Sequence, residues 1–197
     1  LSGEHGDGLQ RSVLNERIFG PELYQAMREF KRIWDPRLLM NPGKKVDAPP
    51  MTENLRYGPK YHARQPKTYL SFAVEGGFDR AVEMCNGAGV CRKLKAGTMC
   101  PSFMATKDEK DSTRGRANAL RNALAGDMLD RPDLASKDVY DTLDLCLSCK
   151  ACKTECPSSV DMAKLKTEFL QHYHDVHGTP LRSRFFGHIH DISKLAS

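Results

Sequence analysis

Four cysteines lie close together in the run Cys146-x2-Cys149-x2-Cys152-x3-Cys156, and a proline follows the last of them. Soft thiolate ligands suit the iron of an iron–sulfur cluster, and they also bind zinc. Gaps of two residues let the backbone curl around one face of a cluster, so that three sulfur atoms reach three iron atoms. Structural zinc sites usually space their cysteine pairs farther apart. The run therefore predicts an iron–sulfur cluster, with a structural zinc site as the alternative.

Three more cysteines form an imperfect repeat of this run, Cys85-x5-Cys91-x8-Cys100, again with a proline after the last cysteine. Ala88 takes the place of the middle cysteine, and a glycine stands on each side of it. These small residues leave backbone N–H groups free to donate to cluster sulfur, which is one way to act on a reduction potential. An ordinary glycine turn gives the same pattern.

In proteins with two clusters, the cysteine before the proline binds the cluster of the other group. On that crossed pattern Cys100 joins the three cysteines of residues 146–152 at one 4Fe–4S cluster. Cys85, Cys91 and Cys156 remain for a second site. Three thiolates suit a 3Fe–4S cluster, or a 4Fe–4S cluster with another kind of fourth ligand. An empty second site, whose cysteines only pack, stays open.

The rest of the composition excludes several classes of protein. The 197 residues are 40% hydrophobic and 28% charged, as in a soluble globular protein. Seven cysteines, an odd number, argue against a secreted disulfide framework. The net charge of +5 is mild, and Arg114, Arg116 and Arg121 read as one solvated helix face, so we expect no nucleic-acid partner and place Arg116 at the surface. No run of about 18 apolar residues predicts a transmembrane segment.

The N-terminal residues 1–46 read as one unit. They open without an initiator Met or a signal peptide, so we interpret the chain as a piece of a longer protein. Pro21 suits the first turn of a helix, and apolar residues then recur at helical spacing as far as Trp34. Asp35, which precedes a proline, should end this helix. We expect Phe30 and Trp34 to be core residues.

Residues 47–70 contain four prolines and few apolar positions, which predicts a linker or an extended strap. Residues 71–197 read as short helices around cysteine loops, with no alternating strand, so the fold class is mainly α. Ser112 or Asp111 can cap one helix, and Ser136 can cap another that runs into the second cysteine group. Either serine of residues 158–159 can cap a third.

Two stretches of the chain resemble a known domain. Residues 84–104, MCNGAGVCRKLKAGTMCPSFM, and residues 143–162, LDLCLSCKACKTECPSSVDM, are similar to the two-cluster α-helical ferredoxin domain of succinate dehydrogenase and glycolate oxidase iron–sulfur subunits. The five-residue gap after Cys85 looks like the 3Fe–4S motif of succinate dehydrogenase. Eight residues instead of three separate Cys91 from Cys100, which departs from the family pattern. The resemblance implies an α-helical ferredoxin-like fold.

The N-terminal residues resemble a second family. SGEHGDG at residues 2–8 and FKRIWDPRLLMNPGKK at residues 30–45 are similar to the C-terminal end of the FAD-linked oxidases. That family includes D-lactate, glycolate and D-2-hydroxyglutarate dehydrogenases. The resemblance implies that Glu4 helps to hold a divalent metal at the substrate. It implies that His5 is the base toward the 2-hydroxyl proton while hydride goes to the flavin.

The two resemblances together match large bacterial fusion flavoproteins and imply an electron-transfer module of an FAD-dependent 2-hydroxyacid dehydrogenase. FAD would bind upstream of this chain, which alone should not act on substrate. The implied partners are the rest of the flavoprotein and an electron acceptor, either a quinone or a redox protein. The implied location is the cytoplasm, with peripheral attachment to the inner membrane left open. The competing hypothesis is a zinc-stabilised interaction domain without a redox role.

Overall fold

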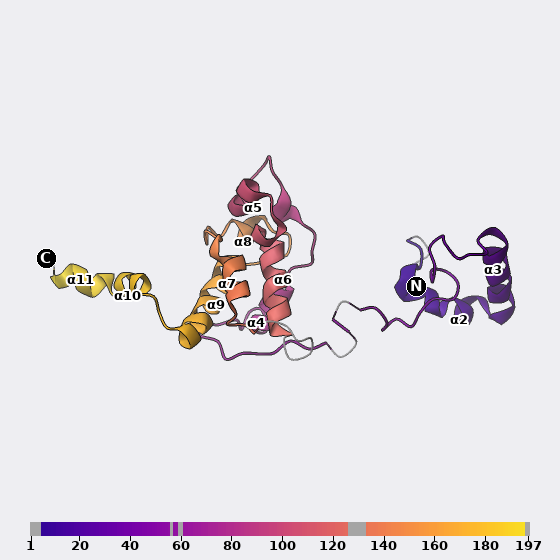
Figure 1. Ribbon diagram of the computed structural model, residues 1–197, viewed down its shortest axis with the longest axis horizontal. Coiled ribbons are helices and arrows are strands. Elements are labelled where there is room, and N and C mark those ends of the chain that lie inside the picture. The colour runs from indigo at the N-terminus through magenta and orange to yellow at the C-terminus, as the bar shows by residue number, and fades with distance from the viewer. Residues whose placement is uncertain (1–4, 56, 59–60, 126–132, 196–197) are drawn as a thin grey trace. The chain divides into compact units, whose positions relative to one another are not determined.

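The computed structural model describes the chain except for residues 1–4, 56, 59–60, 126–132 and 196–197. Within the described residues every regular element is a helix, which agrees with the mainly-α prediction. The chain divides into two compact units, residues 1–61 and residues 62–197, and each is considered by itself (Figure 1). None of the described helices combines the length and the apolar character needed to cross a bilayer.

In its described residues the first unit contains three α-helices and one 3-10 helix: α1 (Gly8–Arg11), η1 (Ser12–Leu14), α2 (Asn15–Phe19) and α3 (Pro21–Trp34). The predicted helix from Pro21 to Trp34 is confirmed. Gly20, at φ 80°, reverses the chain before Pro21 opens the helix. Asp35 ends it, and its carboxylate accepts from the backbone N–H groups of Leu39 and Met40, each at 2.9 Å.

The apolar stripe of α3 is not a core. Phe30 is 65% exposed and Trp34 is 70% exposed, so the prediction that both are core residues is wrong for this unit. Tyr24 is the buried residue of α3, and its hydroxyl accepts from the backbone N–H of Asp47 at 2.9 Å. Helical spacing shows that these side chains share a face, but it does not show that anything covers that face.

The second unit contains eight α-helices and two 3-10 helices among the described residues. They are α4 (Phe78–Glu83), η2 (Val90–Arg92), α5 (Pro101–Thr106), η3 (Glu109–Asp111), α6 (Thr113–Leu124), α7 (Lys137–Asp144), α8 (Ala151–Glu155), α9 (Met162–His177), α10 (Leu181–Gly187) and α11 (Ile189–Leu195). Helices α4, α6, α7 and α9 pack together, as the centre of Figure 1 shows. Their core includes Phe78, Leu120, Leu143 and Phe169, and the buried cysteines join the same cluster.

Side-chain caps begin three of the described α-helices of this unit. The Ser112 hydroxyl accepts from Gly115 N at 2.9 Å, and the Ser136 hydroxyl accepts from Val139 N at 3.4 Å, so both predicted caps are confirmed. The cap predicted at residues 158–159 is wrong. There the chain still turns, with Ser159 at φ 50°, and α9 begins only after Asp161, which accepts from Lys164 N at 3.0 Å.

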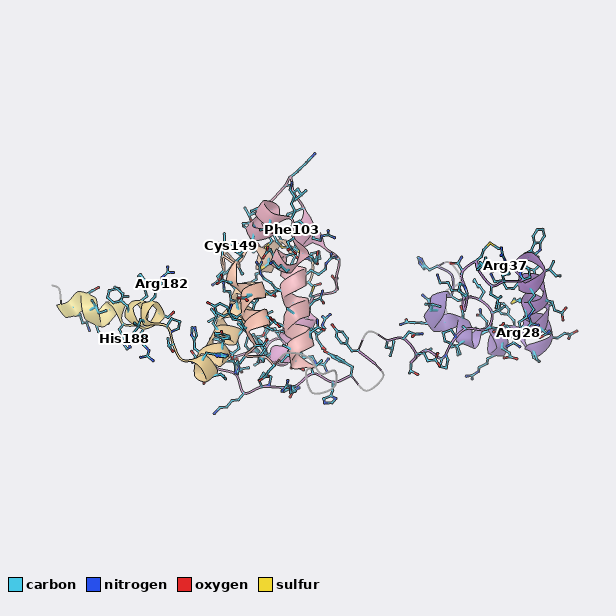
Figure 2. The ribbon with its side chains drawn as sticks, in the orientation of Figure 1. Arg28, Arg37, Phe103, Cys149, Arg182 and His188 are labelled. Carbon is cyan, nitrogen blue, oxygen red and sulfur yellow. The ribbon has the colours of Figure 1, made fainter. Side chains whose placement is uncertain are left out.

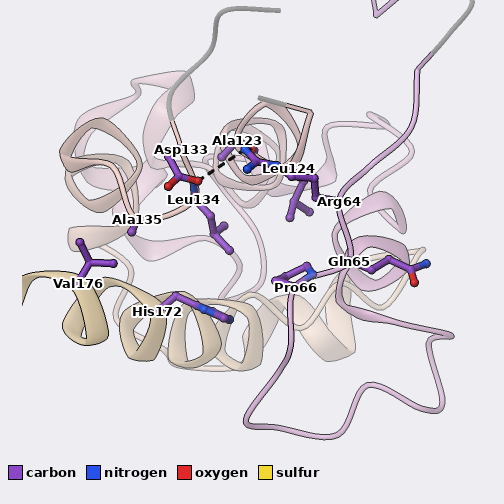
Figure 3. A pocket seen from close by; sticks show the side chains of 10 residues that line it. All are labelled: Arg64, Gln65, Pro66, Ala123, Leu124, Asp133, Leu134, Ala135, His172 and Val176. Carbon is purple, nitrogen blue, oxygen red and sulfur yellow. Dashed lines mark hydrogen bonds and ion pairs between the residues drawn. The ribbon is translucent and has the colours of Figure 1, made fainter. Parts of the chain in front are cut away.

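An extended segment, residues 62–72, lies against α9 and closes the core. Glu168 of α9 is fully buried, and its carboxylate accepts from Tyr69 N at 2.9 Å and from Leu70 N at 2.8 Å. His172 Nε2 is 3.1 Å from Glu168 but makes no hydrogen bond. Figure 3 shows how Arg64 and Pro66 of the segment pass beside His172, around a pocket that Leu134 also lines. A buried carboxylate therefore ties the segment to the helix.

Candidate metal centres

The first cavity is lined by cysteines from both sequence groups. Cys146, Cys149 and Cys152 lie around it, and Cys100 comes to it from the other group. Cys100 precedes α5, whose first residue is Pro101, so the proline fixes the direction in which the chain leaves the cysteine. Cys100 and Cys152 are buried, whereas Cys149, which is labelled in Figure 2, is exposed.

The backbone curls around the first cavity as the spacing predicts. Ser148 and Lys150, the neighbours of Cys149, have φ values of 51° and 61°, in the left-handed region. These two residues reverse the chain on each side of Cys149. All three cysteines line the cavity, and of these Cys149 is exposed, Cys146 is half-buried and Cys152 is buried.

The second cavity is lined by the remaining three cysteines, Cys85, Cys91 and Cys156. Cys156 comes from the group whose other members line the first cavity. Met99 and Thr113 line both cavities, so the two lie next to each other. The fold therefore brings the cysteines together in the crossed grouping, four in one cavity and three in the other.

Arg116 lines the first cavity and is fully buried. Its Nη1 donates to Ser102 Oγ at 2.9 Å and to the Asp111 carbonyl at 2.6 Å, and it lies 3.5 Å from Cys100 Sγ. Its Nε donates to the Thr142 carbonyl at 3.1 Å. The prediction that Arg116 is a surface residue is wrong, because α6 turns it toward carbonyl groups that the sequence places up to 26 residues away.

The other two arginines of α6 are not freely solvated either. Arg114 lines the second cavity, donates to both oxygens of Glu109 at 2.7 and 3.1 Å, and donates to the Gly87 carbonyl at 3.0 Å. The hydrogen bond to Glu109 raises the pKa of Arg114. Arg121 donates to the Cys85 carbonyl at 3.0 Å.

The cysteine environments differ electrostatically. Burial raises the pKa of Cys91 and the pKa of Cys152, because an apolar surrounding disfavours a thiolate. Burial acts in the same direction on Cys100, but hydrogen bonds from Ser102 and the Phe103 backbone and the charge of Arg116 outweigh it, so the pKa of Cys100 is lowered. Among the buried cysteines Cys91, Cys100 and Cys152, Cys100 is thus the one whose thiolate form is favoured by its surroundings.

Glu155 of α8 joins the two cysteine groups directly. Its carboxylate accepts from Thr98 N at 2.7 Å and from the Thr98 hydroxyl at 2.5 Å, and it pairs with Lys93. These contacts, chiefly the one with Lys93, lower the pKa of Glu155 to about 2. The eight-residue gap between Cys91 and Cys100 is therefore held against the helix that carries Cys152. Sequence inspection missed this role.

The donor sets fit iron–sulfur clusters, which take cysteine thiolates. Among the described residues, no group of three or more His, Cys, Asp or Glu side chains is arranged to hold a metal ion. A cluster spreads its ligands over several iron atoms, whereas a single zinc ion holds each sulfur at about 2.3 Å. Cysteines grouped around a cavity therefore suit a cluster better than one zinc ion.

The predicted N-terminal site falls partly outside the structure. Glu4 lies outside the described residues, and His5 is exposed in the first unit. The structure therefore brings the seven cysteines together, while the roles of Glu4 and His5 stay predictions.

Comparisons with known families agree with both resemblances. Residues 1–45 match the FAD linked oxidases, C-terminal domain, and residues 81–160 match the 4Fe-4S dicluster domain. The chain joins an FAD-linked oxidase segment to a 4Fe–4S dicluster domain. The dicluster domain contains all seven cysteines, so iron–sulfur clusters are its expected cofactors, and FAD is the cofactor of the oxidase family.

Two dehydrogenases align with nearly the whole chain, and an iron–sulfur subunit aligns with about a third of it. The chain is 31% identical to D-2-hydroxyglutarate dehydrogenase of Escherichia coli over 237 aligned positions, which cover 99% of this chain and 22% of the relative. The same enzyme of Pseudomonas putida is 30% identical, over 95% of this chain and 22% of the relative. A probable glycolate oxidase iron–sulfur subunit of Bacillus subtilis is 41% identical over 35% of this chain and 15% of the relative. The chain thus spans about a fifth of the dehydrogenases' length. No solved structure gives a significant match.

Proposed function

We propose that this chain is the electron-transfer module of an FAD-dependent 2-hydroxyacid dehydrogenase of the D-2-hydroxyglutarate, D-lactate or glycolate type. Electrons taken from the substrate would leave the flavin singly and reach an external acceptor, a quinone or a redox protein. The proposal includes a cytoplasmic location, peripheral to the inner membrane if the acceptor is a quinone. Similarity to D-2-hydroxyglutarate dehydrogenases along nearly the whole chain supports it.

One observation carries the proposal for the centres themselves. Cys100 lies in one cavity with Cys146, Cys149 and Cys152, and Cys156 lies in the other with two cysteines of the first group, Cys85 and Cys91. We assign these sets as the ligands of a 4Fe–4S cluster and of a second cluster, either 3Fe–4S or 4Fe–4S. When bound, such clusters supply the one-electron carriers that a two-electron flavin needs to serve single-electron acceptors.

The chain's own residues would hold and screen these centres. Met99 and Thr113 stand between the two cavities, so an electron has a short path through packed protein. Met99 and Met162 at the first cavity, and Met99 and Val160 at the second, are almost fully buried, which keeps water from the inner side of each site. Cys149 is exposed, so an outside partner can approach the first centre. Glu4 and His5 keep their proposed roles, metal ligand and base, only in the longer protein.

The test is anaerobic reconstitution with iron and sulfide, followed by measurement of iron, acid-labile sulfide and electron paramagnetic resonance. Cys100→Ala should lose the same signal as Cys149→Ala. Cys156→Ala should lose the same signal as Cys91→Ala and keep the other. If Cys100→Ala spares the centre that Cys149→Ala removes, the ligand assignment is wrong. A colourless protein that takes up zinc instead would favour the zinc-stabilised domain.

A further inference from the structure

The first cavity contains a buried positive charge that no role assigned so far explains. The Arg116 side chain is 0% exposed, and its Nη1 lies 3.5 Å from Cys100 Sγ. A buried guanidinium is costly unless negative groups and hydrogen-bond acceptors surround it. Ser102 Oγ and two backbone carbonyls accept from it, but they are neutral. The charge is therefore solvated by dipoles and needs a negative neighbour.

The nearest carboxylate only partly supplies that neighbour. Arg116 Nη2 and Asp111 Oδ1 are 3.5 Å apart, within ion-pair range, yet neither atom makes a hydrogen bond. A buried N–H group without an acceptor indicates a missing partner. Arg116 lines the cavity of the four cysteines, and sulfur bound in that cavity would carry negative charge.

We propose that Arg116 is a positioning residue that raises the reduction potential of the centre in the first cavity. The inference rests on the proposed function, because it needs a cluster in that cavity. The couple concerned gains one electron, and so the reduced centre is the more negative. A fixed cation and a hydrogen bond to ligand sulfur both stabilise the reduced form more than the oxidised form.

Arg114 provides a matched comparison on the same helix. It lines the second cavity, but Glu109 accepts from it with both oxygens, at 2.7 and 3.1 Å, and its side chain is 24% exposed. Its charge is therefore neutralised by a partner and screened by water. Arg116 should therefore have a large effect on the reduction potential of the first centre, and Arg114 should have no effect on that potential.

The experiment is a redox titration of the reconstituted chain with dithionite as the electron donor, followed by electron paramagnetic resonance. The first centre is identified as the signal that Cys149→Ala loses. At a fixed potential, Arg116→Gln should lower the ratio of reduced to oxidised first centre at least tenfold, which corresponds to about 59 mV for a one-electron couple. Arg116→Lys keeps the charge, so its ratio of reduced to oxidised first centre should stay close to that of the unmodified chain. Arg114→Gln should leave this ratio unchanged.

Three results separate the possibilities. If Arg116→Gln assembles both centres and changes the ratio less than twofold, or if Arg116→Lys shifts it as far as Arg116→Gln, the inference is overturned while the proposed function stands. If the unmodified chain forms no iron–sulfur signal, the proposed function fails instead. If Arg116→Gln does not assemble, Ser102→Ala decides, since Ser102 holds Nη1 against Cys100. It should lower the ratio at least threefold, and no change would overturn the inference.

Discussion

Glu168→Gln should markedly destabilise the second unit. The Glu168 carboxylate is fully buried and accepts from two consecutive backbone N–H groups, those of Tyr69 and Leu70, with one oxygen for each. Glutamine keeps one acceptor oxygen and puts an NH2 group where the other acceptor was. A hydrogen bond to a charged acceptor contributes about 1.5–3 kcal/mol, and a donor left unpaired costs about 1–3 kcal/mol. Because the two bonds are only partly buried, we expect a loss near the lower end, about 2 kcal/mol.

The assay is urea unfolding followed by far-ultraviolet circular dichroism. With a urea dependence of about 2 kcal/mol per M, the Glu168→Gln midpoint should fall by about 1 M. Tyr69→Phe is the matched control, because it removes an exposed hydrogen bond between the same two segments, from Tyr69 Oη to Asp175 at 2.7 Å. Its effect should stay within about 0.5 kcal/mol. Equal midpoints for Glu168→Gln and the unmodified chain would refute the view that this carboxylate anchors the segment.

Two further predictions concern the connections between the cysteine groups. The folded-state pKa of Glu155, about 2, lies below its ordinary value of 4.5, so its contribution to stability is complete above pH 4.5 and is lost as the pH falls toward 2. Without metal, the unmodified chain should have a higher urea midpoint than Glu155→Gln at pH 4.5, and this difference should disappear as the pH falls to 2. A difference between the two midpoints that is the same at both pH values would contradict this prediction. Gly115→Ala should destabilise the chain by at least about 1 kcal/mol, because the added Cβ would lie 2.0 Å from the Glu109 carbonyl oxygen. The measurement is the midpoint of thermal unfolding of Gly115→Ala beside that of the unmodified chain. An unchanged midpoint would show that α6 can move away from the Glu109 carbonyl without cost.

The fold followed from the sequence where local chemistry decides. Pro21 after a glycine, the Ser112 and Ser136 hydroxyls and the spacing of apolar residues act within a few residues, and each predicted helix start at these positions is found. The cap of α9 was misplaced by two residues or more, because Ser159 is held in a left-handed turn after Cys156. Several polar residues precede α9, and which of them caps it depends on where the preceding turn ends, which makes Asp161 the cap.

By itself, the sequence determined the mainly helical class, the cysteine spacing and, with it, the crossed grouping as a hypothesis. The tertiary structure decided which side chains surround the cysteines. Arg116 reads as a surface residue in sequence, yet it is buried, and Ser102 and Thr142 supply acceptors from positions 14 and 26 residues away, besides the nearby Asp111 carbonyl. Trp34 reads as a core residue, yet it is exposed in its unit. Periodicity gives the polarity of a helix face, whereas burial depends on which other segments pack against that face.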